Sequence, residues 1–257
     1  MQATMIKIAI ITTAYKRPLI LDLFLKNFIA VQNEVKEWCE LSLNLASSYE
    51  DFMQIDRKLF SEGMSFVEHE NLPLGLKWNE SLKHHRGYDY ALIVGSDDIF
   101  NAQLLESYKP YCYANYDYIG LLDSFYYYIY YPDCMRYFAG YNGERQGEPD
   151  GGGRLIHKSI LENVNYKLWD DELNSGLDLS LTNRIKPFVK KSKFLVGADK
   201  GIYFIDIKSD VNITHFNDIK CPTIPIHEAT KILKSFSIYE DIMKTHLVYK
   251  NNQPTTE

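Results

Sequence analysis

The chain has 257 residues, of which 46% are hydrophobic and 24% are charged, and its formal net charge at pH 7 is −6. This length supports one large α/β domain, and the acidic balance argues against the broad basic face that nucleic-acid-binding proteins carry. Four cysteines without a CxxC pair argue against a zinc site and against a disulfide framework. We expect a cytoplasmic protein without integral membrane contact, because no signal-peptide pattern is present and no apolar run reaches the ~20 residues of a membrane span.

Apolar runs and helical periodicity alternate four times in the first hundred residues. Short apolar runs rich in β-branched residues predict buried strands at 6–13, 40–46, 65–69 and 88–94. Apolar residues at helical spacing predict the intervening helices at 18–32, 52–60 and 76–85. This order predicts an α/β fold with a doubly wound, mostly parallel, Rossmann-like sheet.

Polar loops follow three of these predicted strands. They comprise residues 12–17, 47–51 and 95–98. Ligands bind at the carboxyl ends of the strands in such sheets, so we expect these loops to converge on one binding site.

The second half of the chain has a less regular pattern. Strands are predicted at 116–122, 194–197 and 201–206, and helices at 154–163, 175–185 and 226–236. The tyrosine-rich run 125–131 predicts either a packed strand or an aromatic acceptor groove. We expect one domain over 1–240, with a nucleotide-binding half at 1–100 and an irregular acceptor half at 101–240, followed by a frayed polar tail at 241–257.

The turn Gly95-Ser96-Asp97-Asp98 directly follows a predicted buried strand. Two adjacent carboxylates repel each other, and a divalent cation such as Mg²⁺ or Mn²⁺ relieves that repulsion. Such an ion also stabilises a nucleotide diphosphate as a leaving group. A helix cap or simple turn is the alternative, since Ser and Asp favour both. The position of the turn within the α/β alternation favours the metal site.

The segments 8–18 (IAIITTAYKRP) and 92–98 (LIVGSDD) resemble the first strand and the metal-binding turn of GT-A glycosyltransferases of family 2. The resemblance covers about residues 6–100. It implies a nucleotide-sugar donor whose nucleoside contacts the first loop. It implies donor-binding roles for four side chains: Thr13, Tyr15, Arg17 and Ser96.

The same resemblance implies a metal held by Asp97 and Asp98, although Gly95 stands where the family has the first Asp of its DxD motif. It implies His215 as a further metal ligand on the C-terminal side. It also places Asp178 at the start of a helix, as the general base that takes the proton of the acceptor hydroxyl. The alternative for His215 is a structural role, and the alternative for Asp178 is that its charge stabilises a helix N-terminus.

Three other residues are candidates for the donor site. Ser48 lies near the position where the family has an acid after its second strand, and Asn79 follows Gly75 in a family-like Gly-x-x-x-Asn spacing. Arg154 ends the run Asp150-Gly151-Gly152-Gly153-Arg154, in which glycines allow close approach of a ligand and the guanidinium suits phosphate. A flexible linker is the alternative for that run.

Together with these patterns, the resemblance implies a metal-dependent transferase that moves a sugar from a nucleoside-diphosphate sugar, with a UDP-sugar favoured, to an acceptor hydroxyl with inversion. The acceptor is expected to be a glycan or a hydroxylated nucleobase in DNA of the phage type. A nucleotidyltransferase is an alternative, but the loop 12–18 lacks the glycines that hold a triphosphate. A second alternative is a module that binds a nucleotide sugar without catalysis, because Gly95 stands where the family has the first Asp of its DxD motif.

Overall fold

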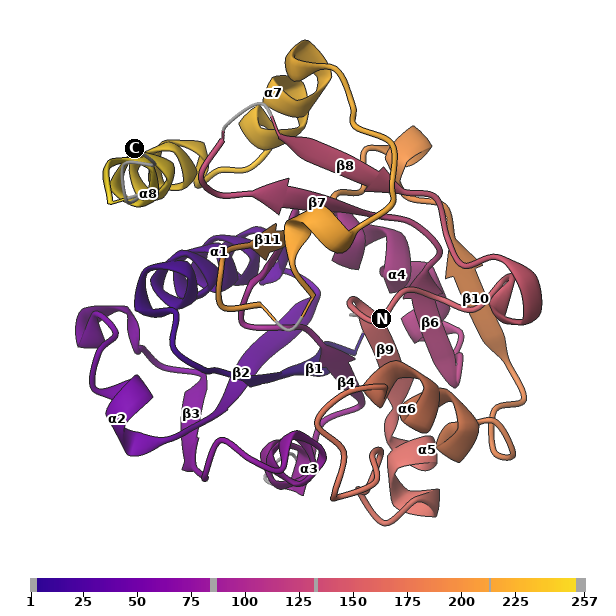
Figure 1. Cartoon of the computed structure of the whole chain (residues 1–257). Coiled ribbons are helices and arrows are strands. Elements are labelled where there is room, and N and C mark those ends of the chain that lie inside the picture. The colour runs from indigo at the N-terminus through magenta and orange to yellow at the C-terminus, as the bar shows by residue number, and fades with distance from the viewer. Residues whose placement is uncertain (1–3, 84–86, 132–133, 213, 253–257) are drawn as a thin grey trace.

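The computed structural model describes residues 4–83, 87–131, 134–212 and 214–252. Two sheets form the framework, and helices cover both faces of the larger one (Figure 1). Among the described residues, no helix combines the length and the apolar character that a bilayer crossing requires.

The larger sheet has seven strands in the order β10-β6-β9-β4-β1-β2-β3. β1, β2, β3 and β4 run parallel, as the alternation in the first hundred residues predicts, and β10 runs parallel to β6. Only β9 within this sheet runs antiparallel to its described neighbours, β4 and β6. The strand bounds are β1 Ile6–Thr13, β2 Cys39–Ser47, β3 Met64–Glu68, β4 Tyr90–Ile93, β6 Tyr118–Leu121, β9 Arg154–His157 and β10 Ser192–Leu195.

Helices α1 and α4 pack on one face of this sheet, and α3, α5 and α6 pack on the other. The alternation of β1 explains both contacts: Ile8 and Ile10 belong to the first core, whereas Ala9 and Ile11 belong to the second. The helix bounds are α1 Pro18–Val35, α3 Leu74–Lys83, α4 Gln103–Tyr113, α5 Lys158–Asn163 and α6 Leu177–Ile185. Short helical turns are α2 Tyr49–Phe52, η1 Arg57–Leu59, η2 Gly143–Arg145, η3 Ala198–Lys200 and η4 Phe216–Asp218.

A second sheet of four strands lies over one end of the first, in the order β5-β11-β7-β8. Its apolar residues share a core with α1, α7 and α8, which ties the C-terminal segment to the first hundred residues. The bounds are β5 Asp98–Phe100, β7 Ser124–Tyr128, β8 Met135–Phe138, β11 Phe204–Lys208, α7 Ile226–Lys234 and α8 Tyr239–Asn251.

Three local predictions are wrong. Residues 154–157 form β9, not the start of a helix, because the strand fills the gap between β4 and β6 and its apolar side chains Leu155 and Ile156 enter opposite cores. The predicted helix 52–60 is two short turns separated by a bend. The segment 241–251 is the helix α8 rather than a frayed tail, and Ile242 anchors it in the second core; residues 253–257 lie outside the described residues.

Candidate functional site

Two adjoining cavities open at the carboxyl ends of β1 and β4. The larger has a volume of about 680 Å³ and the smaller about 300 Å³. The larger is lined by four side chains that the sequence assigns to the donor: Thr13, Tyr15, Arg17 and Ser96. The acidic turn separates the two cavities, because Gly95 and Asp97 line both. The polar loops 12–17 and 95–98 therefore converge as predicted, whereas the loop 47–51 lines neither of these two cavities.

Asp97 is tied to two side chains from other parts of the chain. Its Oδ2 lies 2.6 Å from Arg17 Nη1 and accepts a hydrogen bond from Asn212 Nδ2 at 2.6 Å. Burial alone would raise the pKa of Asp97, but the charges of Arg17 and Lys208 outweigh it and hold that pKa below its ordinary value. Arg17 also lines the larger cavity, where its charge partly neutralises the acidic turn.

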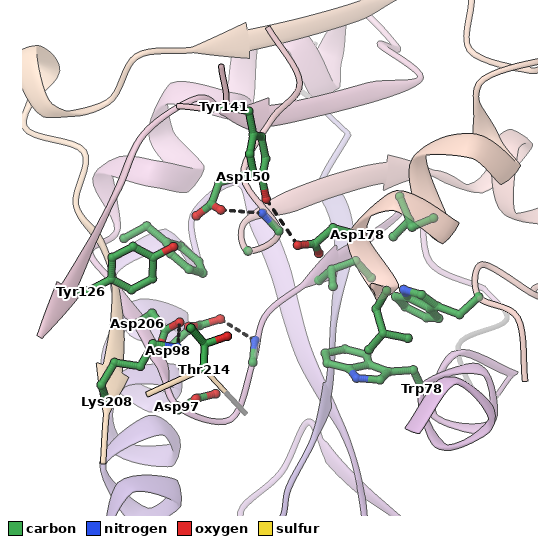
Figure 2. Close-up of a pocket in the computed structure, with 18 residues that line it drawn as sticks. Trp78, Asp97, Asp98, Tyr126, Tyr141, Asp150, Asp178, Asp206, Lys208 and Thr214 are labelled. Atoms are coloured by element: carbon green, nitrogen blue, oxygen red, sulfur yellow. Dashed lines mark hydrogen bonds and ion pairs between the residues drawn. The ribbon is translucent and has the colours of Figure 1, made fainter. Parts of the chain in front are cut away.

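Asp98 faces a second carboxylate, that of Asp206, across the pairing of β5 with β11. Asp98 Oδ2 accepts a hydrogen bond from the Gly95 amide at 2.6 Å, and Asp206 Oδ2 lies 2.6 Å from Lys208 Nζ (Figure 2). Burial raises the pKa of Asp98 well above its ordinary range, and the charges of Asp206 and Asp97 raise it further. Burial raises the pKa of Asp206 to about 6, against the opposing charge of Lys208.

The residues at this turn fit a divalent cation in part. Asp206 Oδ1 is buried and has no hydrogen-bond partner among the described residues. The carboxylates of Asp97, Asp98 and Asp206 also repel one another. Within the described ranges, no three His, Cys, Asp or Glu side chains are already gathered as a complete ligand set. Mg²⁺ in nucleotide sites is typically held by one or two carboxylates, with water and phosphate oxygens as the other ligands. Asp98 and Asp206 match that smaller set.

A buried lysine reaches the larger cavity from α3. The Lys77 side chain donates to the Ala14 carbonyl oxygen and to Asn71 Oδ1, the second at 2.8 Å. An ammonium group has three N–H donors, so the described residues use two of them. Burial lowers the pKa of Lys77 to about 8, although the charge of Asp51 opposes this shift.

The smaller cavity contains the acidic side chain predicted as the base. Asp178 lies in the first turn of α6, and Tyr141 donates to its Oδ2 at 3.4 Å (Figure 2). The glycine run passes between Asp178 and the second sheet. A Cβ on Gly151 would lie 2.5 Å from Asp178 Oδ1, and one on Gly152 would lie 2.3 Å from Phe204 Cε1. These two glycines therefore allow side chains of the protein itself, Asp178 and Phe204, to pack closely against the backbone, whereas the sequence predicts a close approach of a ligand.

Arg154 and Asn79 have scaffold roles instead of the predicted ligand-binding roles. Arg154 is 0% exposed, and its guanidinium donates to four acceptors: Pro149 O, Asp150 O, Asp178 O and Thr182 Oγ1. The prediction that Arg154 binds phosphate is therefore wrong, since a buried guanidinium that gives four of its five N–H donors to the protein cannot reach a ligand. Asn79 is buried and bonds the backbone of Leu168 and Trp169, so it shapes the cavity only through Trp169.

Ser48 and His215 also lie away from the cavities. Ser48 caps α2 and donates to Asp51 Oδ2 at 3.0 Å, and Asp51 in turn accepts the Lys16 amide at 3.2 Å. Ser48 thus supports the loop 12–17 indirectly, through Asp51. His215 is exposed at the start of η4, and in the described part of the chain it forms no ligand group with the acidic turn. The structure therefore does not bring His215 to the predicted metal site.

Sequence reasoning missed several site residues. Asp206 and Lys208 both lie on β11 with one residue between them, and alternation of side chains along a strand would have placed them on one face. Their pairing with the acidic turn depends on the second sheet, which no local pattern predicts. Lys77 is missed because a lysine on a helix is normally solvated.

No family model matches the chain, and no curated protein matches its sequence. Among solved structures, S. aureus TarS residues 1–349 in complex with UDP-GlcNAc is similar with a TM-score of 0.57 and 15% identity, over 95% of this chain and 72% of that one. The mannosyltransferase PcManGT from Pyrobaculum calidifontis, in complex with GDP-Man and Mn²⁺, gives 0.54 and 9%, over 96% and 75%.

A third similar structure is 4-diphosphocytidyl-2C-methyl-D-erythritol synthase from Anaerococcus prevotii, with a TM-score of 0.51 and 14% identity over 90% of this chain and 96% of that one. A synthase therefore shares the fold with the two transferases, and the activity has to be argued from the site. What these similarities establish is the architecture: the chain has the GT-A fold of the glycosyltransferases TarS and PcManGT, as its segments 8–18 and 92–98 predicted.

Proposed function

We propose that this protein is a glycosyltransferase that moves a sugar from a nucleoside-diphosphate sugar to an acceptor hydroxyl. The observation that carries the proposal is the pair of cavities on either side of the acidic turn. The larger has the size and lining of a nucleotide site, and the smaller holds a carboxylate at a helix start. A transferase needs this division, because donor and acceptor must meet at one sugar carbon.

The larger cavity suits the nucleoside, and we propose uridine. Tyr15 is 39% exposed and offers a flat face for stacking on a base. Lys77 carries donors and no acceptor, so it favours a base edge that presents carbonyl oxygens, as uracil does, over one that presents only an amino group. The bound UDP-sugar of TarS is consistent with this choice.

The acidic turn suits the diphosphate with a divalent cation, Mn²⁺ or Mg²⁺, held by Asp98 and Asp206. A bound ion would screen the diphosphate charge that grows as the sugar leaves. Arg17 and Lys208 line the larger cavity beside Asp97, so their charges act on the same leaving group. The complex of PcManGT with GDP-Man and Mn²⁺ is consistent with a divalent cation in a protein of this fold.

Asp178 suits the general base. Its carboxylate takes the acceptor proton while the acceptor oxygen bonds to the anomeric carbon and the bond from that carbon to the diphosphate oxygen breaks. Nucleoside diphosphate then leaves with the bonding electrons. Attack from the side opposite the leaving group inverts the anomeric configuration, and the placement of Asp178 and the acidic turn on different walls of the smaller cavity favours that direction.

The test is a panel of UDP-, GDP- and TDP-sugars, each with Mn²⁺, scored for binding by calorimetry and for slow release of nucleoside diphosphate. We expect UDP-sugars to bind in the micromolar range and to be hydrolysed slowly without acceptor. Binding without any hydrolysis or transfer would instead favour a binding module. No binding of any sugar nucleotide would refute the proposal.

A further inference from the structure

Asp150 lies in the loop before β9, and its backbone is held on both sides. Its amide donates to the Leu121 carbonyl at 2.7 Å, and its carbonyl accepts from Arg154 Nε at 2.7 Å. The carboxylate Oδ1 accepts the Gly151 amide at 2.8 Å. The same side chain lines the smaller cavity, near Tyr141 (Figure 2). Asp150 is therefore fixed toward the cavity by contacts of the protein itself.

Asp150 and Asp178 stand on either side of Gly151. Asp150 bonds the amide of this glycine, and Asp178 lies against its Cα, on the side where a Cβ would project. Burial raises the pKa of Asp150, and the nearby charge of Asp178 raises it further. Tyr141 joins the pair, since its hydroxyl donates to Asp178. The cavity thus offers two adjacent carboxyl groups to whatever acceptor enters it.

Two adjacent carboxyl groups match two adjacent hydroxyl groups. A hydroxyl that gives its proton to Asp178 leaves a neighbouring hydroxyl of the same molecule within reach of Asp150, which accepts its hydrogen bond. We propose that Asp150 binds a second acceptor hydroxyl beside the reacting one, so that the acceptor is a sugar or polyol with vicinal hydroxyls. This inference rests on the proposed function, because the reacting hydroxyl is the one assigned to Asp178.

The charge of the smaller cavity supports an uncharged acceptor. Its lining includes five aspartates, residues 97, 98, 150, 178 and 206, and one lysine, Lys208. A DNA strand that carried a hydroxylated base into this cavity would bring its phosphates toward these carboxylates, at a repulsive cost. A hydroxymethyl base also carries one hydroxyl, so Asp150 would have no partner on it. The cavity therefore favours a glycan over modified DNA.

The first test uses the wild-type protein with the UDP-sugar that it hydrolyses best. The acceptors are methyl hexosides with free vicinal hydroxyls, their monodeoxy analogues, and an oligonucleotide that carries hydroxymethylated bases. We expect removal of the hydroxyl beside the reacting one to lower kcat/KM about tenfold or more, as for other hydrogen bonds to a charged group. Equal use of single-hydroxyl acceptors or of the oligonucleotide would overturn the inference.

The second test compares Asp150→Asn with Glu144→Gln, a control at an exposed carboxylate of the same loop. We expect Asp150→Asn to raise KM for the vicinal-diol acceptor about tenfold with little change in kcat, and to have no further effect on the matching deoxy acceptor. Glu144→Gln should match the wild type. The role of Asp150 would be refuted if the Asp150→Asn variant binds UDP normally but shows a lower kcat with an unchanged KM. It would also be refuted if neither kcat nor KM changes. Failure of the wild type to bind any sugar nucleotide would instead refute the proposed function.

Discussion

Asp98 and Asp206 lie opposite each other on the antiparallel strands β5 and β11, where Asp98 is buried, Asp206 is partly buried, and the charge of Asp206 raises the pKa of Asp98. Carboxylates placed in this way repel each other unless a cation or a proton lies between them. The pair comes from distant parts of the chain, and it exists only because the second sheet brings β11 against the acidic turn.

Mn²⁺ should therefore raise the melting temperature of the protein in the presence of UDP. Asp206→Asn should weaken Mn²⁺ binding at least tenfold, because it removes one of the two carboxylates that we propose as ligands. His215→Ala, which changes an exposed residue outside the cavities, should leave the affinity unchanged. Calorimetric titration with MnCl₂ checks both. Loss of binding in His215→Ala and retention in Asp206→Asn would reverse this assignment.

The affinity for UDP should fall as the pH rises through about 8. The protonated Lys77 ammonium is the form that donates to a ligand, and its pKa of about 8 means that the charge is lost above that pH. Between pH 7 and 8.5 the charged fraction falls about fourfold, and the affinity should follow. Lys77→Met should bind UDP weakly and without this pH step. Lys83→Met, at an exposed position on the same helix, should keep the wild-type profile, and a flat profile for the wild-type protein would exclude Lys77 from the site.

Asp178→Asn should bind the donor as the wild type does and lose transfer by a factor of about 10² to 10⁴, the usual contribution of a general base. The carboxamide keeps the shape of the side chain but cannot take a proton at neutral pH. Single-turnover transfer rates measured beside calorimetric UDP affinity separate the two effects. Retained transfer would remove Asp178 from the role of base.

Arg154→Met should destabilise the protein by about 3 kcal/mol. The change removes the guanidinium from four acceptors, several of them buried, and each unsatisfied buried group costs about 1–3 kcal/mol, partly offset by the loss of a buried charge. Arg184→Met, which breaks a surface pair with Asp170, should change the free energy of unfolding by less than about 1 kcal/mol. Urea denaturation measures both, and equal values for the two variants would contradict the scaffold role of Arg154.

The sequence predicts the parts of this fold whose contacts are local. The strand β1, helix α1 and the acidic turn follow from apolar runs, helical spacing and Pro18 at a helix start. The apolar pattern of residues 154–157 is compatible with a helix or a strand. The segment is a strand because it pairs with both β4 and β6. The pattern of α8 is also ambiguous, because its single strongly buried aliphatic side chain, Ile242, gives a weak helical signal.

The candidate site likewise contains residues that a local pattern predicts and residues whose role depends on contacts between distant parts of the chain. The resemblance of the segments 8–18 and 92–98 implies donor-binding roles for Thr13, Tyr15, Arg17 and Ser96, and these residues line the larger cavity because they lie at or just after the ends of β1 and β4. Arg154 was misassigned because a guanidinium after three glycines has the same sequence whether it faces a ligand or four backbone and side-chain acceptors. Burial decides between the two, and burial depends on contacts with α6 that lie far along the chain.

The central claim is that the two cavities hold a sugar nucleotide and an acceptor at one reacting carbon. The most direct measurement is the transfer of a labelled sugar from a UDP-sugar to a vicinal-diol acceptor with Mn²⁺, with the product separated and its anomeric configuration determined by NMR. We expect a glycosylated acceptor of inverted configuration and one equivalent of UDP. Release of UDP without any glycosylated acceptor across a broad acceptor panel, or no release from any sugar nucleotide, would contradict it.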